Sequence, residues 1–270
     1  MNKNWHFIID QGGTFTDIIA ISPDKTVITK KVLSRKKVPL YNPILEGITE
    51  IKKNSNFSLH KIDSIKIGTT IATNALLERK GYNVLLITTK GFKDNLIIGT
   101  QQRDKIFARH HSRKANLYKN VLEVNERISS SGEFIIPLDE KKVYKDLKFY
   151  LKKRIDSISI VLINSFKFPE HEKKLKAIAK NIGFKNISCS HEVSPTMNFT
   201  YRGYTTLIDS YLNPIIKKYT KDIENKVNAK KIFYMQSNGL LVDNKNFNGR
   251  NAILSGPAAG VNGGIHIAKK

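Results

Sequence analysis

The octet at residues 10–17, which reads DQGGTFTD, combines side chains that can bind a phosphate group and its metal ion. Its two glycines let backbone N–H groups approach an anion closely. Its threonine hydroxyls can donate hydrogen bonds to phosphate oxygens, and the aspartate at each end can hold hydrated Mg²⁺ or position a water molecule. The alternative is an ordinary hairpin in which the glycines only make the turn. The residues concerned are Asp10, Gly12, Gly13, Thr14, Thr16 and Asp17.

Two short apolar runs must position this octet. Residues 5–9 precede it and residues 18–21 follow it, and both runs are rich in β-branched or aromatic side chains. They predict two strands joined by a tight glycine turn. Because no helical pattern follows the glycines, the octet differs from a Rossmann dinucleotide motif, and the chain contains no G-x-x-x-x-G-K-[ST] P-loop.

Three further turns carry residues suited to a ligand. Residues 68–70 lie between a strand and a helix, where N–H groups and hydroxyls suit an anion or simply cap the helix. Residues 255–260 form a glycine-rich turn into a helix, which either approaches a nucleotide or packs closely on the sheet. Residues 236–239 directly follow a strand and make either a ligand loop or a plain turn. The candidate residues in these turns are Thr69, Thr70, Gly256 and Asn238.

Strand and helix patterns alternate through the rest of the chain, which predicts an α/β protein that opens with a β-meander. Asn42 and Pro43 start a helix, Asp139 caps a lysine-rich one, and Pro214 is expected to kink or break the longest one. Residues 101–119 form a charged, irregular segment that is either a surface loop or a lid. The expected strands are 5–10, 18–21, 26–34, 65–67, 83–88, 157–164, 186–190 and 231–236, and the expected helices are 44–53, 72–80, 140–154, 169–182 and 203–226.

The bulk composition limits the class of protein. With 270 residues and 40% hydrophobic side chains, the chain can form one large domain or two ordinary ones. It has no apolar run of the roughly 20 residues that a membrane helix needs and no signal-peptide pattern at its start, so no membrane partner is expected. Its one cysteine, Cys189, cannot form an internal disulfide, which favours a cytoplasmic location.

The net charge of +23 raises the question of nucleic-acid binding. The lysines are scattered, and no zinc-finger spacing, RNP-like aromatic motif or basic helix with heptads accompanies them. A charged, solvated surface is therefore favoured over a nucleic-acid site. The histidines show no metal-ligand spacing, and Cys189 lies in an apolar strand where packing is its expected role.

Six motifs, taken in order, resemble the hydantoinase/oxoprolinase enzymes, a family that includes the acetone carboxylase β-subunits. The family pattern D-x-G-G-T-F-T-D is the opening octet, and G-T-T-x-A-T-N-A-L-L-E-R-K-G, T-x-G-F-x-D, H-E-V-S-P, M-Q-S-N-G and S-G-P-A-A-G follow it over nearly the whole chain. Two departures concern the substrate: Ile67 stands where the family has histidine, and residues 100–104 replace an R-Q-x-R-P-like segment. The six motifs occupy residues 10–17, 68–81, 89–94, 191–195, 235–239 and 255–260.

The resemblance implies a fold and a domain division. The fold is the α/β fold of the actin, sugar-kinase and Hsp70 ATPases, built from ribonuclease-H-like halves, with the opening hairpin as its first phosphate loop. Residues 5–198 are expected to form the hydantoinase/oxoprolinase N-terminal domain, and residues 199–270 the beginning of the hydantoinase A domain. Because the family's second D-x-G-G-T loop does not follow, the second half is expected to be incomplete and the chain to be the N-terminal part of a longer enzyme.

The resemblance also implies an activity. Family members couple ATP hydrolysis to the opening of cyclic amides such as hydantoin, N-methylhydantoin or 5-oxoproline, or to ketone carboxylation. ATP and Mg²⁺ are then the cofactors, a cyclic amide is the substrate, and a hydantoinase B-type subunit is the partner. ATP phosphorylates a poorly electrophilic carbonyl oxygen and so creates a leaving group. The alternatives are an acetone carboxylase-like β-subunit, a non-catalytic fragment that binds a partner, and a sugar- or acetate-type kinase, which the motif at 68–81 disfavours.

Residue roles follow from the same resemblance. Asp10 and Asp17 are the expected catalytic carboxylates, and Asp10 is expected to hold the Mg²⁺ ion or its water shell. Asn74 and Asn238 are expected on the substrate side. The expected nucleotide-binding residues are Gly12, Gly13, Thr14, Thr16, Thr69, Thr70 and Gly256.

Overall fold

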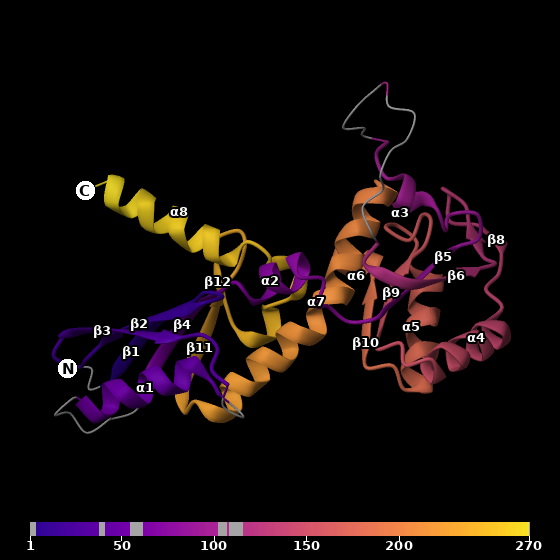
Figure 1. Ribbon diagram of the computed structural model, residues 1–270. Helices are drawn as coiled ribbons and strands as arrows, with labels where there is room; N and C mark the ends of the chain where they lie inside the picture. Colours follow the sequence, from indigo (N-terminus) through magenta and orange to yellow (C-terminus); the bar gives the residue numbers. More distant parts are fainter. Residues whose placement is uncertain (1–3, 38–40, 55–61, 102–106, 108–115, 270) are drawn as a thin grey trace. The chain divides into compact units, whose positions relative to one another are not determined.

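The computed structural model describes residues 4–37, 41–54, 62–101, 107 and 116–269. Contacts between Cα atoms divide the chain into two compact units. Unit 1 comprises Met1–Lys80 and Ile215–Lys270, and unit 2 comprises Gly81–Pro214. The chain therefore leaves unit 1 once and returns to it through a helix (Figure 1). The expected domain division between residues 198 and 199 concerns family domains and stays a prediction.

Unit 1 is built on a six-stranded mixed sheet with the order β12-β11-β4-β1-β2-β3. β1, β2 and β3 form the predicted antiparallel meander, with Asp10 paired to Asp17 in the first hairpin. β4 runs parallel to both β1 and β11, so the carboxyl ends of these three strands lie at one edge of the sheet. The strands are β1 Trp5–Gln11, β2 Phe15–Ile21, β3 Val27–Leu33, β4 Ile62–Thr69, β11 Ala229–Met235 and β12 Leu241–Val242.

Strict alternation of side chains gives this sheet one buried face. Along β1, Trp5, Phe7 and Ile9 are buried, whereas Ile8 and Asp10, on the other face of the strand, are exposed. Helix α1, Pro43–Asn54, packs against β2 and β3 on the buried face and contributes three buried isoleucines at helical spacing. Asn42 caps α1 as predicted. Its side-chain oxygen accepts hydrogen bonds from the N–H groups of Ile44 at 3.0 Å and Leu45 at 3.2 Å.

Unit 2 holds a four-stranded, all-parallel sheet with the order β10-β9-β5-β6. Every residue of β5 and β9 is buried, as expected for central strands of a parallel sheet. A small β7–β8 ribbon and the helices α3, α4, α5 and α6 accompany this sheet, and α4 packs against α5 (Figure 1). The elements are β5 Val84–Thr89, α3 Asn95–Ile98, β6 Tyr118–Val124, β7 Arg127–Ile128, β8 Phe134–Ile136, α4 Glu140–Lys152, β9 Ser157–Val161, α5 Glu170–Ile182, β10 Asn186–Cys189 and α6 Ser190–Val193.

Helix α7, Phe199–Lys226, continues through Pro214 without a break. Proline has no N–H to donate to the carbonyl of Ser210, four residues earlier. The buried hydroxyl of Ser157 donates to that carbonyl instead, at 2.7 Å, and the next carbonyl, that of Tyr211, accepts from the N–H of Tyr82 at 3.2 Å. The bond from Ser157 gives the Ser210 carbonyl the partner that the proline removes, so the helix runs on as one element.

A buried carboxylate joins the carboxyl ends of β9 and β10. One oxygen of Glu172 accepts from the N–H of Leu162 at 3.0 Å and from the hydroxyl of Ser190 at 2.7 Å. The other oxygen accepts from the N–H of His191 at 3.0 Å and from its Nδ1 at 2.6 Å. Arg202, also buried, donates from Nε to Ser190 at 3.1 Å. This network anchors α5 and α7 to the end of the parallel sheet.

The predicted strands and helices are confirmed in kind, and several limits need correction. The helix expected at 72–80 is α2, Ile71–Leu77, because Arg79 adopts a left-handed φ of 56°. The strand expected at 157–164 stops at Val161, shortly before Asn164, whose φ is 58°. The loop expected at 101–119 lies largely outside the described residues, and its end is the strand β6. Among the described residues, no helix is long and apolar enough to span a bilayer.

Replacing Glu172 by alanine is expected to lower the free energy of unfolding by about 3 kcal/mol, because buried donors lose their acceptor inside the protein. Glu192 is the matched control, since its carboxylate pairs with Lys176 at 2.6 Å in a more exposed position. Glu192→Ala should cost less than about 1 kcal/mol. Urea unfolding followed by circular dichroism measures both values, and equal costs would contradict the role given to Glu172.

Candidate functional site

Four segments of the chain meet at the carboxyl edge of the sheet in unit 1. The N–H of Thr70, after β4, donates to the carbonyl of Gln11, at the end of β1, at 3.1 Å. The hydroxyl of Ser255, the first residue of helix α8 (Ser255–Ala268), donates to the carbonyl of Thr69 at 2.6 Å. The hydroxyl of Ser237, after β11, accepts from the N–H that precedes α8 at 3.0 Å. The turn at 12–14, the end of β4 with Thr70, the turn at 236–239 and residues 255–260 therefore form one continuous rim. Residues 255–260, expected as a turn before a helix, are the first residues of α8 itself.

The hairpin tip presents unused donors to solvent. The N–H of Gly12 closes the turn onto the carbonyl of Phe15 at 3.0 Å, and the carbonyl of Thr14 accepts from the N–H of Ser34 at 2.8 Å. Within the described part of the chain, the N–H groups of Gly13 and Thr14 and the hydroxyl of Thr14 have no partner, and both residues are exposed. Converging free donors of this kind suit an anion.

Two glycines permit close contacts around this tip. A Cβ on Gly13 would lie 3.2 Å from Nδ2 of Asn74, and a Cβ on Gly256 would lie 3.2 Å from Cγ2 of Thr70. Gly68 lies beneath, with Oδ1 of Asp10 at 3.6 Å from its would-be Cβ. Because these glycines have no side chains, the backbone at the hairpin tip stays accessible to a ligand. Asn74 and Asp10 lie beside it. This arrangement fits a phosphate group and its hydrated cation.

Asp10 and Asp17 stand side by side on the exposed face of the hairpin. They are direct cross-strand partners, and Nζ of Lys31, on β3, lies 2.5 Å from Oδ1 of Asp17. Partial desolvation and then the charge of Asp17 raise the pKa of Asp10, and Lys31 opposes this shift. Two adjacent carboxylates are ligands that a hard divalent cation prefers, and such a cation would relieve their repulsion.

Thr16 and Thr69 were predicted to bind the nucleotide, but their hydroxyls are buried and cannot contact a ligand at the rim. Thr16 is fully buried and hydrogen-bonds the hydroxyl of Ser34 at 2.9 Å. Thr69 is 1% exposed, and its hydroxyl accepts from the N–H of Ile71 at 3.3 Å. Both side chains lie on the core side of the sheet, because alternate residues of a strand point to opposite faces. Thr14 and Thr70 retain access to the rim.

The two predicted asparagines are placed differently. Asn74 donates from Nδ2 to the hydroxyl of Thr70 at 3.1 Å and lies beside Gly13, so it belongs to the rim. Asn238 is exposed, and its side-chain oxygen accepts from the N–H of Leu240 at 3.0 Å. That bond forms an Asx turn, so Asn238 lies in the 236–239 part of the rim with its side-chain oxygen held within the turn.

Sequence reasoning missed Lys31, Gln11 and Tyr219. Lys31 reaches Asp17 only through the register of β2 and β3. Tyr219 lies on α7 and donates from its hydroxyl to Oε1 of Gln11 at 2.6 Å, a contact between residues far apart in the sequence. No motif marks either contact, so only the folded chain identifies them.

Two other features of the molecule hold groups that could bind a ligand, and the first is a cluster in unit 2. Side-chain donors of Glu172, Cys189 and His191 lie within 4.8 Å of one another. The 2.6 Å separation between Nδ1 of His191 and Glu172 is a hydrogen bond, and it leaves no room for an ion between those atoms. Burial raises the pKa of the Cys189 thiol, so it remains a packed, protonated side chain.

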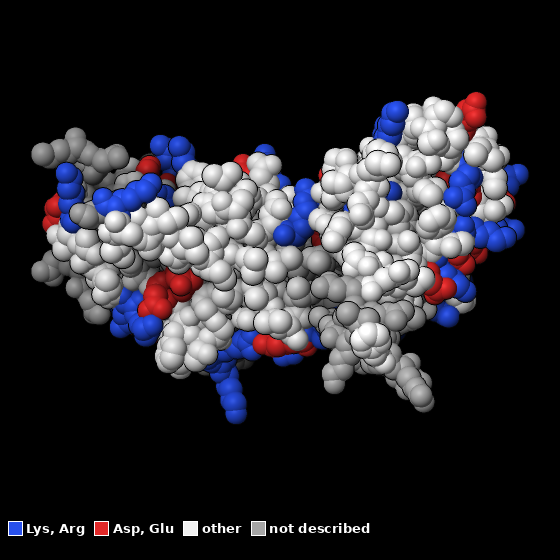
Figure 2. All heavy atoms as spheres, turned by 90° about the horizontal axis from the view of Figure 1, so that it is seen from above, with Lys and Arg blue, Asp and Glu red and all other residues white. Residues whose placement is uncertain are grey.

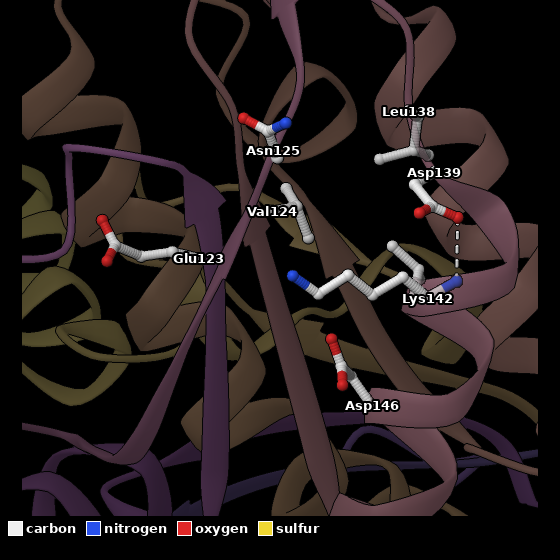
Figure 3. Close-up of a pocket in the computed structure, with 8 residues that line it drawn as sticks. Glu123, Val124, Asn125, Leu138, Asp139, Lys142 and Asp146 are labelled. Atoms are coloured by element: carbon white, nitrogen blue, oxygen red, sulfur yellow. Dashed lines mark hydrogen bonds between the residues drawn. The ribbon is translucent and has the colours of Figure 1, made fainter.

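A hollow of about 150 Å³ in unit 2 lies between the end of β6 and the start of α4, with the chain of Lys142 reaching across it (Figure 3). Asp139 uses one oxygen to cap α4, accepting from the N–H of Lys142 at 3.0 Å, and Glu123 accepts from the N–H of Gly91 at 2.7 Å. None of the predicted site residues lines this hollow. Its lining is Glu123, Val124, Asn125, Leu138, Asp139, Lys142, Val143 and Asp146.

Charged side chains are interspersed on the face shown in Figure 2. Lysines and arginines alternate there with acidic and uncharged residues, and the described residues in view show no continuous basic patch. Several lysines are paired with carboxylates, including Lys30 with Glu50 at 2.5 Å and Lys226 with Asp222 at 2.7 Å. On this face the positive charge is spread as a solvated surface.

Comparison with known proteins identifies the family. The profile "Hydantoinase/oxoprolinase N-terminal region" matches residues 6–183, and the profile "Hydantoinase/oxoprolinase" matches residues 202–270. The chain therefore belongs to the hydantoinase/oxoprolinase family, as its motifs predicted.

Individual relatives agree with this assignment. The chain is 37% identical to the 5-oxoprolinase of Dictyostelium discoideum over 97% of its own length and 24% of that protein. It is 29% identical to the acetophenone carboxylase gamma subunit of Aromatoleum aromaticum, over 97% of this chain and 39% of that one. The structure of the ATP-dependent caprolactamase from Pseudomonas jessenii matches with a TM-score of 0.84 and 27% identity, covering 98% of this chain and 40% of that chain. The mixed α/β fold is thereby confirmed, and the chain spans about a quarter to two fifths of these relatives.

Asp10→Asn is expected to raise the melting temperature at pH 7. The pKa of Asp10 is higher in the folded protein than in the unfolded chain, so between these two pKa values the folded state keeps a proton that the unfolded chain has lost. The free energy of unfolding therefore falls as the pH rises from the ordinary pKa to the raised one. The amide removes that penalty. The gain should vanish near pH 3, below the ordinary pKa of 3.8, where both states are protonated. Calorimetry at pH 3, 5 and 7 measures it.

Asp24 provides a control of opposite sign. Hydrogen bonds from the hydroxyl of Ser22 and then the N–H of Thr26 lower the pKa of Asp24. Its charged form stabilises the fold above the ordinary pKa, and this contribution is lost as the pH falls through the lowered pKa. Asp24→Asn should therefore lower the melting temperature at pH 7. Shifts of the same sign in the two variants would contradict the environment assigned to Asp10.

Proposed function

We propose that this chain is the nucleotide-binding part of an ATP-dependent hydrolase that opens cyclic amides of the hydantoin, N-methylhydantoin or 5-oxoproline type. We also propose that unit 1 is a ribonuclease-H-like half of the actin, sugar-kinase and Hsp70 superfold. The meander followed by parallel strands supports the fold assignment. Membership of the hydantoinase/oxoprolinase family supports the activity.

One observation carries the proposal: the free N–H groups and hydroxyl at the hairpin tip lie next to the Asp10–Asp17 pair. Donors for phosphate oxygens and carboxylates for a cation are needed together to hold Mg-ATP. Gly13 and Thr14 would hold the phosphates from the hairpin, whose turn the N–H of Gly12 closes, and Thr70, Asn74 and Gly256 would border the same group across the rim. Asp10 would hold Mg²⁺ directly or through its waters, with Asp17 beside it.

The chemistry begins with a carbonyl oxygen of the cyclic amide, which takes the γ-phosphoryl group as ADP leaves. A water molecule then adds to the activated carbon, and the carbon–nitrogen bond breaks as the ring nitrogen takes a proton. A second water molecule converts the resulting acyl phosphate into a carboxylate and inorganic phosphate. Phosphoryl transfer relies on positioning and on neutralising charge, which are the tasks that the hairpin donors can perform. The bound Mg²⁺ ion would neutralise phosphate charge.

A carboxylase is the second candidate, because the match to the acetophenone carboxylase gamma subunit covers nearly the whole chain. In that reaction the activated oxygen belongs to a ketone enolate or to bicarbonate, and the same hairpin would serve. In both readings we propose a separate partner subunit, of the hydantoinase B type for the hydrolase. The domains 5–198 and 199–270 remain our proposed division of the chain at the family level.

Nucleotide binding is expected to stabilise the chain. With a Kd of ~1 mM, 10 mM Mg-ATP raises the free energy of unfolding by about 1.4 kcal/mol. Thr14→Ala removes a hydroxyl donor to an anion and should weaken binding roughly tenfold. Thr29→Ala is the control, since Thr29 is an exposed threonine of the same sheet. Thermal shift and calorimetry measure the two variants, and equal affinities would show that the hairpin tip is not the phosphate site.

Turnover tests the reaction itself. The chain, alone and together with a hydantoinase B-type polypeptide, is incubated with Mg-ATP and with 5-oxoproline, hydantoin, N-methylhydantoin or caprolactam. Phosphate release coupled to a ring-opened product, detected by mass spectrometry, is expected for at least one amide, and Asp10→Ala should reduce it by ~10²–10³. Phosphate release that depends on ketone and bicarbonate instead would favour the carboxylase. Nucleotide binding without any turnover would favour the non-catalytic alternative.

A further inference from the structure

The side chain of Gln11 is held in one orientation at the base of the hairpin. Gln11 is the last residue of β1, and it pairs with Thr69 of β4 on the face of the sheet opposite Asp10. Tyr219 of α7 donates from its hydroxyl to Oε1 of Gln11 at 2.6 Å. The main-chain carbonyl of Gln11 accepts from the N–H of Thr70 at 3.1 Å. Both the backbone and the side chain of this residue are therefore anchored.

The hydrogen bond from Tyr219 sets the orientation of the amide. A phenol carries one hydrogen atom, and Tyr219 donates it to Gln11. The acceptor that receives it must be Oε1, because Nε2 of an amide carries only donors.

This arrangement turns Gln11 into a donor group. Its oxygen is occupied, and in the described part of the chain its two Nε2 hydrogens have no acceptor. The residue is half-buried and lies two residues before Gly13, whose N–H group is also free. A group that can only donate hydrogen bonds favours an anionic oxygen over a cation. A cation is instead suited to the opposite face, which carries Asp10 and Asp17.

We propose that Gln11 binds the same anion as the hairpin, donating from Nε2 to a phosphate oxygen, and that Tyr219 is its positioning residue. This inference rests on the proposed nucleotide site and extends it to the other face of the sheet. The hairpin then separates two tasks: Asp10 and Asp17 serve the cation on one face, and Gln11 serves the phosphate on the other. Helix α7 takes part in ligand binding through Tyr219.

The chain provides a matched control for Tyr219. Tyr234 on β11 is buried, and its ring centroid lies 6.4 Å from that of Tyr219. Its hydroxyl has no hydrogen-bond partner among the described residues. Tyr219→Phe and Tyr234→Phe therefore remove the same atom from neighbouring rings, and only the first removes the bond to Gln11.

The experiment measures Mg-ATP affinity by calorimetry, and unfolding by urea, for the full chain and for the variants Gln11→Ala, Gln11→Glu, Tyr219→Phe and Tyr234→Phe. Gln11→Ala should weaken binding about tenfold, as expected for losing a hydrogen bond to a charged group. Gln11→Glu should weaken it further, because it replaces the donors with a negative charge. Tyr219→Phe should weaken binding about threefold or more, and Tyr234→Phe should leave it unchanged.

The outcomes separate this inference from the proposed function. If the wild-type chain does not bind Mg-ATP, the proposed nucleotide site fails and Gln11 fails with it. If the wild type binds and Gln11→Ala binds equally well, the nucleotide site stands and Gln11 is not a ligand. If Tyr219→Phe loses stability while keeping the affinity of Tyr234→Phe, Tyr219 only ties α7 to the sheet, and its positioning role is overturned.

Discussion

The pairing of β4 with β1 on one side and β11 on the other is the constraint on which the candidate site depends. Both pairings are parallel, so three strands from distant parts of the sequence end at the same edge. The turns that follow them supply the hairpin tip, the start of α2 and the loop at 236–239, whose Ser237 hydrogen-bonds the residue before α8. The hydrogen bond from Ser255 to the carbonyl of Thr69 spans 186 residues and closes this rim. Without these pairings the four glycine-rich or polar turns would be unrelated loops.

Much of the chemistry at this edge comes from the backbone. Among the described residues of the hairpin tip, the turn uses the N–H of Gly12 and leaves those of Gly13 and Thr14 free. The glycines let neighbouring groups come within about 3 Å of where a Cβ would stand. Strand geometry then selects which side chains join them. Alternation sends Asp10 and Asp17 to the exposed face and Thr16 and Thr69 into the core. The site therefore contains fewer hydroxyls than its composition suggests, and more main-chain donors.

Unit 2 shows how an all-parallel sheet is closed at its carboxyl end by buried polar groups. The first turn of α5 places His171 and Glu172 side by side, and each is paired: His171 with Glu126 and Glu172 with His191, both at 2.6 Å. A partner for every buried charge is what makes such groups tolerable in a core. A buried polar group also lets α7 continue through Pro214, because the hydroxyl of Ser157 donates to the Ser210 carbonyl that the proline leaves without a partner.

The sequence alone determined the elements and the family. Glycine turns, caps such as Asn42 and Asp139, and alternating apolar residues are local signals, because each depends on neighbours within a few residues. These signals sufficed for the α/β class, the opening meander and the candidate residues Asp10, Gly13 and Thr14. Motif order sufficed for the hydantoinase/oxoprolinase family and for the candidate Asn74.

Only the tertiary structure decided which candidates share a site. It joined Gly256 to Thr70, buried Thr16 and Thr69, left Asn238 in an Asx turn, and introduced Lys31, Gln11 and Tyr219. The physical reason is that strand register and helix packing are set by the burial of apolar faces over the whole unit. A one-residue shift in register would exchange the two faces of a strand, and no local pattern at Gln11 or Tyr219 records which partner lies opposite.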